Sequence, residues 1–148
     1  MNIYKLDLSL IRFFHLISVP VARIGLFTIF FWFGILKVVG LSPASPLVHE
    51  LLSVTMPQIP FTTFVVFLGV FECIIGILFL IKGLERVVIP VLCLHMITTF
   101  LPLFLLPHSV WISFGVPTME GQYIIKNLVI IATAIGIAAH LHPLHKKI

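Results

Sequence analysis

The fold is decided by one stretch, residues 61–81, which reads FTTFVVFLGVFECIIGILFLI and carries a single charged side chain, Glu72. An apolar run of about 20 residues is long enough to cross the roughly 30 Å hydrocarbon core of a bilayer as a helix. The whole chain of 148 residues is 60% hydrophobic and 9% charged, whereas a soluble domain carries about 25% charge. The sequence therefore predicts an integral membrane protein.

Three more apolar runs predict transmembrane helices, at about residues 20–41, 87–106 and 121–141. Pro20 suits the first turn of its helix, where the missing N–H group is harmless. Pro102 falls inside the third of the four predicted helices, where it removes a backbone hydrogen bond and predicts a kink. The expected fold is an all-α membrane protein, a single four-transmembrane-helix bundle over residues 1–148.

Residues 1–18 are too polar to span a membrane. Apolar side chains recur on one side of this segment at helical spacing, at Leu6, Leu10, Phe13, Phe14 and Ile17. Lys5 and Arg12 fall on the opposite side, which is the pattern of a helix lying in the membrane interface. The alternative is an unstructured tail with a few anchors.

Lysine and arginine are distributed unequally among the predicted loops. One side of the membrane receives Lys5, Arg12, Arg23, Lys82, Arg86, Lys146 and Lys147, and the other, residues 42–60 and 107–121, receives none. This asymmetry predicts a multi-pass protein with both termini cytoplasmic. The expected location is a bacterial-type inner (plasma) membrane. A short amphipathic helix is expected in the first outer loop, at Leu47–Val54. The net charge of +4 is too small and scattered for nucleic-acid binding.

Ionisable residues inside the predicted spans mark the candidate site, because a charge near the membrane centre costs roughly 2.5–3.5 kcal/mol. Counting about 1.5 Å per residue places Glu72 and His95 near the midplane, and Lys37 and Lys126 in the outer half. Polar neighbours are expected on the same faces, at Thr98, Thr99, Gln122, Tyr123 and Asn127. The sequence predicts one polar site, in which Glu72 and His95 carry protons. The residues expected to bind a ligand there are Lys37, Lys126, Thr99, Gln122, Tyr123 and Asn127.

Lys37 and Lys126 carry two positive charges, whereas Glu72 supplies one negative charge at depth, so the predicted site has a net positive charge. Either one lysine is neutral, or an anionic or electron-rich ligand completes the site. Three simpler alternatives remain open. The lysines snorkel outward, Glu72 forms a structural pair with a lysine, and His95 is a hydrogen-bonded core histidine.

Small residues recur every seven positions, at Gly69, Gly76 and Gly83, and predict close approach of another helix that would hold Glu72 in place. Cys73 and Cys93 are expected to be apolar fillers without a disulfide. The histidines His140, His142 and His145 are interpreted as a titratable tail. No metal site is predicted.

Four segments together resemble the DoxX-like superfamily of small four-helix membrane proteins: FGILK at 33–37, GVFECIIG at 69–76, His95, and GQYIIKN at 121–127. The first and last are also similar to its reactive-chlorine-resistance inner-membrane branch, in which an acidic residue often follows the lysine where this chain has Asn127. The resemblance covers residues 23–139. The resemblance implies the four-helix fold. It also implies a role like those of family members, which are linked to quinone-coupled thiosulfate oxidation, to oxidative-stress complexes and to membrane-protein assembly.

Three functions follow as hypotheses. The first is a redox- or oxidative-stress-associated membrane subunit that binds a quinone or a small anion. No covalently bound cofactor is expected, so the redox cofactor would be a diffusible quinone or would belong to a soluble partner. The second is a non-catalytic scaffold or assembly factor. The third is a small-solute carrier or channel, which with four helices would require a homo-oligomer.

Overall fold

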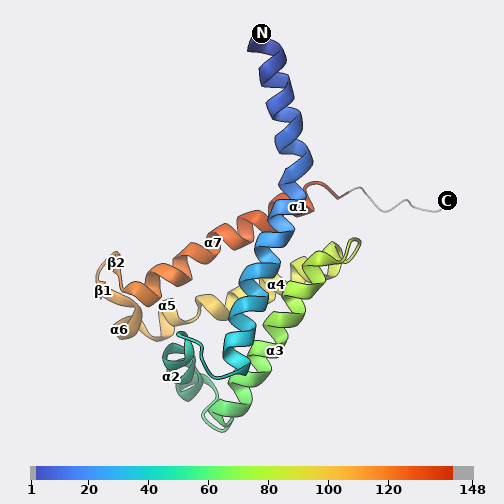
Figure 1. Cartoon of the computed structure of the whole chain (residues 1–148). Helices are drawn as coiled ribbons and strands as arrows, with labels where there is room; N and C mark the ends of the chain where they lie inside the picture. Colours follow the sequence, from blue (N-terminus) through green and yellow to red (C-terminus); the bar gives the residue numbers. More distant parts are fainter. Residues whose placement is uncertain (1–2, 142–148) are drawn as a thin grey trace, which may run out of the picture.

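The computed structural model describes residues 3–141, which are mostly helical (Figure 1). The long helices are α1 (Ile3–Val38), α3 (Phe61–Leu80), α4 (Glu85–Phe100) with its continuation α5 (Pro102–Leu105), and α7 (Met119–Ala138). Four of the described segments, with α4 and α5 counted as one, are long and apolar enough to cross a membrane. This confirms the prediction of a multi-pass membrane protein with four candidate spans.

Shorter elements fill the two connections at one end of the molecule. Helix α2 (Ser45–Thr55) includes the segment in which the sequence predicted a short helix. The other connection holds α6 (Pro107–Val110) and an antiparallel hairpin of β1 (Trp111–Ser113) and β2 (Val116–Pro117). The hairpin was not expected. Its turn contains Gly115 at φ 74°, a conformation that favours glycine.

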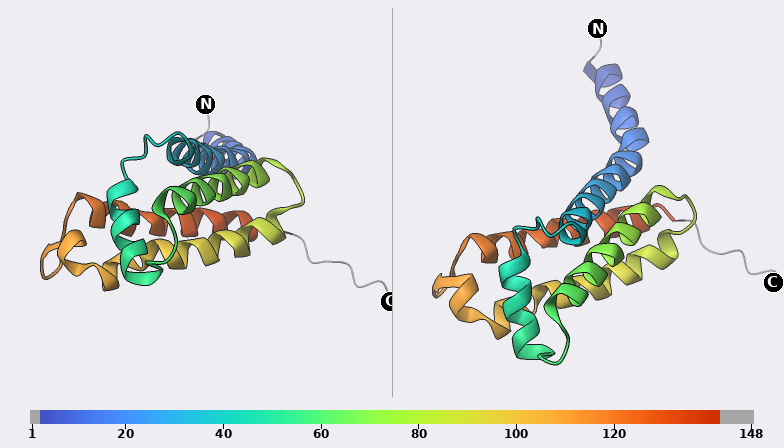
Figure 2. Two further views of the ribbon diagram at one scale, coloured as in Figure 1. Left: turned by 90° about the horizontal axis from the view of Figure 1, so that it is seen from below. Right: turned by 60° about the horizontal axis from the view of Figure 1, so that its bottom comes forward.

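The long helices form two pairs. Helix α1 packs most extensively against α3, and α4 packs against α7. In the left view of Figure 2, the α1 and α3 pair forms a layer over the α4 and α7 pair. The apolar core lies between the layers, with contributions from Leu26, Phe30, Ile75, Phe79, Leu92, Met96 and Ala134.

Glycines bring the backbones of α1 and α3 together. A Cβ atom on Gly34 would lie 2.6 Å from the Gly69 carbonyl oxygen, and one on Gly69 would lie 2.6 Å from the Gly34 carbonyl oxygen. Further along the pair, a Cβ atom on Gly76 would lie 2.9 Å from the Phe31 backbone nitrogen. The predicted close approach is therefore confirmed at Gly69 and Gly76. Gly83 takes no part, because it lies in the α3–α4 turn at φ 92° with open space around it.

The first helix differs from its predicted bounds. The sequence predicted an interfacial helix at 1–18 and a separate span at 20–41, and the break between them is wrong, because α1 is one helix of 36 residues with Pro20 inside it. Proline has a φ angle suited to a helix, and here it removes a single backbone hydrogen bond without ending the helix. Pro102 does interrupt its helix, because α4 ends at Phe100 and α5 begins at Pro102.

Replacing Gly34 by alanine tests the glycine contact. The added Cβ would also lie 2.7 Å from Cys73 Sγ, so we expect Gly34→Ala to lower the free energy of unfolding by about 1–3 kcal/mol. Unfolding of the detergent-solubilised protein by sodium dodecyl sulfate, followed by circular dichroism, measures it. Gly25→Ala is the matched control on the same helix, because its Cβ would meet nothing within 4 Å. Equal stability of the two variants would contradict the close packing.

Candidate functional site

A buried ion pair joins α1 to α3. Lys37 lies in the last turn of α1 and Glu72 near the middle of α3. The Lys37 Nζ atom donates to Glu72 Oε2 at 2.5 Å, and the two side chains are only 8% and 10% exposed. Gly34 is one helical turn before Lys37, and Gly69 is three residues before Glu72. The close backbone approach at these two glycines therefore brings the ammonium and the carboxylate within hydrogen-bonding distance.

The second carboxylate oxygen faces α4. His95 Nε2 lies 3.4 Å from Glu72 Oε1, and the imidazole is also buried. The rings of Phe30 and Phe71 pack edge-on around it, with centroids 5.9 and 5.6 Å from that of the imidazole. Lys37, Glu72 and His95 thus form a continuous polar chain across three helices, which we call the buried triad.

The hydroxyl groups near His95 do not extend the triad. Thr98 Oγ1 and Thr99 Oγ1 both donate to the backbone carbonyl of His95, at 2.7 and 3.1 Å. Thr99 is half-buried. The predicted role of Thr99 as a ligand-binding residue therefore gains no support from its position, because its hydroxyl proton is already engaged.

Lys126 lies apart from the triad. Its side chain is exposed on α7, and its Nζ atom lies 5.3 Å from the centroid of the Tyr123 ring. Tyr123 is nearly one turn closer to the start of α7, so the lysine reaches back along its helix, as a snorkelling lysine does. Gln122 and Tyr123 are also exposed, and Asn127 is half-buried. The structure therefore does not bring these four residues to Glu72.

The predicted site with a positive surplus is thus not formed around Glu72. Helix α7 packs mainly on α4, and this packing turns Lys126 outward. Of the two lysines, Lys37 faces Glu72 and balances its charge. The sequence predicts similar depth for the two lysines but not the rotation of each helix about its axis, and that rotation decides which lysine pairs with Glu72.

A second buried ion pair was missed by the sequence analysis. Arg23 on α1 and Glu85 at the start of α4 form a salt bridge, with each side chain about 10% exposed. Arg23 Nε also donates to the Phe79 carbonyl oxygen near the end of α3 at 2.7 Å, and the Gly83 N–H group donates to Glu85 Oε2 at 2.7 Å. Arg23 therefore holds the α3–α4 turn against α1 through these contacts. The available signal was that Glu85 is the one acidic residue in this turn and lies at the depth of Arg23.

A third cluster joins the two connections at the other end. Glu50 on α2 accepts from Ser109 Oγ at 2.7 and 2.9 Å, and His108 Nε2 lies 2.6 Å from Glu50 Oε1. Thr118, which caps α7, donates from its hydroxyl to the Ser109 carbonyl oxygen at 2.9 Å. The hydrogen bond from Ser109, with a smaller contribution from His108, holds the pKa of Glu50 below its ordinary value of 4.5 despite partial burial.

Two shallow hollows lie away from the buried triad. One, of about 190 Å³, is between α1 and α7, and the other, of about 250 Å³, is between α2 and the start of α3. Neither is lined by a member of the triad. Among residues 3–141, no three histidine, cysteine or acidic side chains gather as metal ligands would, and Cys73 and Cys93 are free thiols. His142 and His145 lie outside the described residues.

The triad can hold a charge inside the membrane and move a proton. Its carboxylate is fixed by an ammonium on one oxygen, and the other oxygen faces an imidazole, the side chain best suited to exchange protons near neutral pH. Comparison with protein-family models, curated proteins and solved structures gives no match. The functional interpretation therefore depends on the geometry of the site and the resemblance of its motifs.

Removing the Lys37 charge should destabilise the fold strongly. We expect Lys37→Met to lower the free energy of unfolding by about 3–5 kcal/mol, because it leaves a buried carboxylate without its cation. The double variant Lys37→Met/Glu72→Gln should recover a large part of that loss. The same detergent unfolding assay measures both. Lys126→Met is the matched control, with an expected change within about 0.5 kcal/mol, and a loss equal to that of Lys37→Met would contradict the assignment.

Acid should weaken the Glu50 cluster. The pKa of Glu50 is lower in the folded state, so its ionised form stabilises the fold fully above pH 4.5, and this contribution is lost as the pH falls through the lowered folded value. The difference in unfolding free energy between the native protein and Ser109→Ala reports this contribution. We expect it to be constant from pH 7 to about pH 5 and to shrink below 4.5. A difference that stays constant down to pH 3 would contradict this interpretation.

Proposed function

We propose that the chain is a DoxX-like inner-membrane protein and a redox- or oxidative-stress-associated subunit, in which Glu72 and His95 exchange protons with a quinone or another small redox-active ligand. The observation that carries the proposal is the buried triad, in which one carboxylate oxygen is held by Lys37 and the other faces His95. The resemblance of four short motifs to the superfamily supports the class of reaction.

The division of roles follows from the contacts. Lys37 keeps Glu72 oriented, so it is a positioning residue. His95 is the proton carrier, because an imidazole acts both as a general acid and as a general base near neutral pH. Oxidation of a quinol releases two protons and two electrons. His95 and Glu72 would accept protons, and the electrons would pass to a redox cofactor of a partner protein, since this sequence contains no recognisable haem, flavin or iron–sulfur motif.

We further propose that the spans form a four-helix bundle with both termini in the cytoplasm. The end that holds Arg23, Lys82 and Arg86 would face the cytoplasm, following the bias of Lys and Arg. The connections holding α2 and the hairpin would then face outward. In this orientation Lys126 extends toward the outer surface, in keeping with its contact with Tyr123.

A scaffold or assembly factor is the second candidate, and one observation favours it. Lys37 already balances the charge of Glu72, so the polar core is stable without a ligand. Under this alternative, the triad would set the packing of α1, α3 and α4. Changing it would then reduce the amount of folded protein in the membrane and leave no separate catalytic defect.

The two candidates are separated by His95→Gln and Glu72→Gln, compared with Lys126→Met as the control. Protein purified with its native lipids is assayed for bound quinone and for electron exchange with quinol, alone and with co-purified partners. The redox proposal expects that electron exchange per molecule of folded protein falls at least about 100-fold in both glutamine variants and is unchanged in the control. A protein without quinone and without electron exchange would contradict the proposal, and reduced abundance alone would favour the scaffold.

A further inference from the structure

Helix α1 is much longer than a membrane crossing requires. Its 36 residues extend about 54 Å at about 1.5 Å per residue, against a hydrocarbon core of about 30 Å. Residues 20–38 are sufficient to cross it. Residues 3–18, which we call the N-terminal arm, project beyond the ends of α3 and α7 (Figures 1 and 2).

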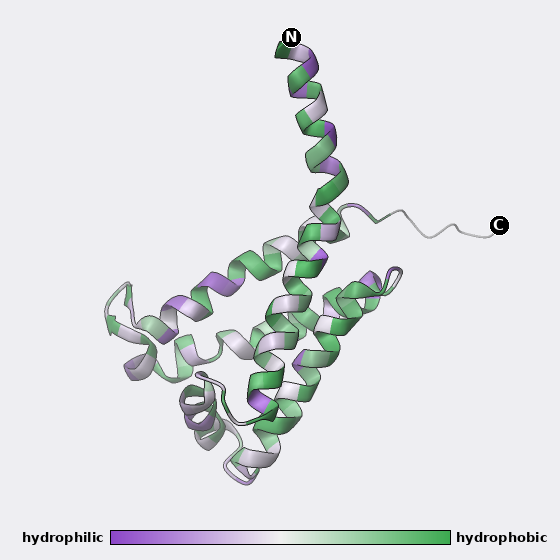
Figure 3. Ribbon diagram, viewed as in Figure 1, coloured by the Kyte–Doolittle hydropathy of each residue, from purple (hydrophilic) through white to green (hydrophobic). Residues whose placement is uncertain are grey.

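The N-terminal arm has an apolar face that the described chain leaves uncovered. Its large side chains are exposed by 43% to 84%, at Ile3, Leu6, Leu10, Phe13 and Phe14. Lys5, Ser9 and Arg12 lie on the other side of the helix, and purple and green bands alternate along the arm in Figure 3. A row of exposed apolar side chains of this size indicates a surface that contacts lipid or another protein.

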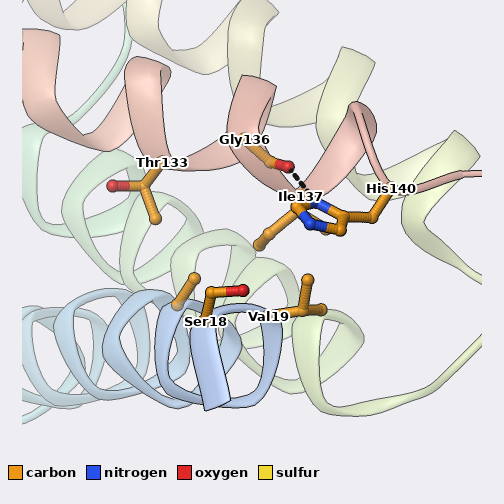
Figure 4. A pocket seen from close by; sticks show the side chains of 7 residues that line it. Ser18, Val19, Thr133, Gly136, Ile137 and His140 are labelled. Carbon is orange, nitrogen blue, oxygen red and sulfur yellow. Dashed lines mark hydrogen bonds between the residues drawn. The ribbon is translucent and has the colours of Figure 1, made fainter. Parts of the chain in front are cut away.

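The direction of this face favours lipid as its occupant. Ser18 and Val19 face α7, across the hollow lined by Thr133 and His140 (Figure 4). The side of α1 that holds Gly34 faces α3. At about 100° per residue, the apolar face of the arm is turned about 100° or more from both neighbours. An arm that bends toward its apolar face therefore leaves the protein and meets the surrounding bilayer.

The junction between the arm and the span can bend. Pro20 has no N–H group, so the carbonyl oxygen of Leu16 lacks its usual helical partner. Ser18 Oγ donates to the His15 carbonyl oxygen at 3.1 Å, a local bond that often accompanies helix bending. Bending away from α7 would separate the His15 and His140 rings, whose centroids are 5.5 Å apart. Both side chains are exposed, so separating the two rings costs little free energy.

We propose that the N-terminal arm bends at Pro20 and lies on the anionic surface of the same membrane. Leu6, Leu10 and Phe13 would enter the boundary between headgroups and acyl chains, as in other interfacial amphipathic helices. Lys5 and Arg12 on the opposite side would be attracted by acidic headgroups.

Spin labels placed along the arm test the proposal. In the full chain with Cys73→Ala and Cys93→Ala, single cysteines replace Leu6, Leu10 and Phe13 on one face, and Lys5, Ser9 and Arg12 on the other. In vesicles of phosphatidylcholine and phosphatidylglycerol, we expect oxygen, which concentrates in lipid, to reach the first three labels best. A water-soluble nickel chelate should reach the other three best. Six labels equally accessible to the chelate would overturn the proposal, as would three apolar positions shielded from both reagents by protein.

Two further samples test separately the bending at Pro20 and the attraction of the arm to acidic lipid. Pro20→Ala restores the missing hydrogen bond, so labels at Leu10 and Phe13 should lose oxygen accessibility and gain chelate accessibility. An unchanged pattern would contradict bending at Pro20. Vesicles of phosphatidylcholine alone should also reduce the immersion of both labels. Immersion that is independent of the acidic lipid would contradict the electrostatic part of the proposal.

Discussion

The structure depends on one interaction, the ion pair between Lys37 and Glu72 inside the apolar part of the molecule. A lone carboxylate at this depth would be strongly unfavourable, and the pair is possible only because α1 and α3 approach closely. Gly34 and Gly69 permit that approach, since neither position has room for a Cβ atom. The close packing and the ion pair therefore depend on each other. Larger residues at Gly34 or Gly69 would move the Lys37 ammonium away from the Glu72 carboxylate.

Helix α1 supplies the cation at both ends of the packed region. Lys37 pairs with α3, and Arg23 pairs with Glu85 of α4 while also binding the Phe79 carbonyl near the end of α3. Each cation meets a fixed acceptor on a different neighbour, so these two contacts restrict both the rotation and the sliding of α1 against α3 and α4. His95 then lies against the second oxygen of Glu72 with aromatic rings around it, which places an imidazole in a buried, mostly apolar environment.

The four spans could be predicted from the sequence because long apolar runs determine them. The pairing of Glu72 with a lysine was also among the alternatives, because a charge inside a membrane requires a partner. Which lysine would pair was beyond reach, since two lysines at equal depth differ only in how their helices are rotated. The sequence predicts Arg23 at one side of the membrane but not its pairing with Glu85, because burial at a helix end depends on tertiary packing. The continuity of α1 through Pro20 was missed because proline is also common in a first helical turn.

The most direct test of this account is the distance between Lys37 and Glu72 in a lipid bilayer. Solid-state nuclear magnetic resonance can measure the dipolar coupling between lysine ¹⁵Nζ and glutamate ¹³Cδ, with Lys37→Met as the variant that assigns the signal. We expect a strong coupling, consistent with the 2.5 Å distance between Nζ and Oε2, and the loss of this coupling in the variant. A coupling no stronger in the native protein than in Lys37→Met would contradict the ion pair on which the site and the proposed function depend.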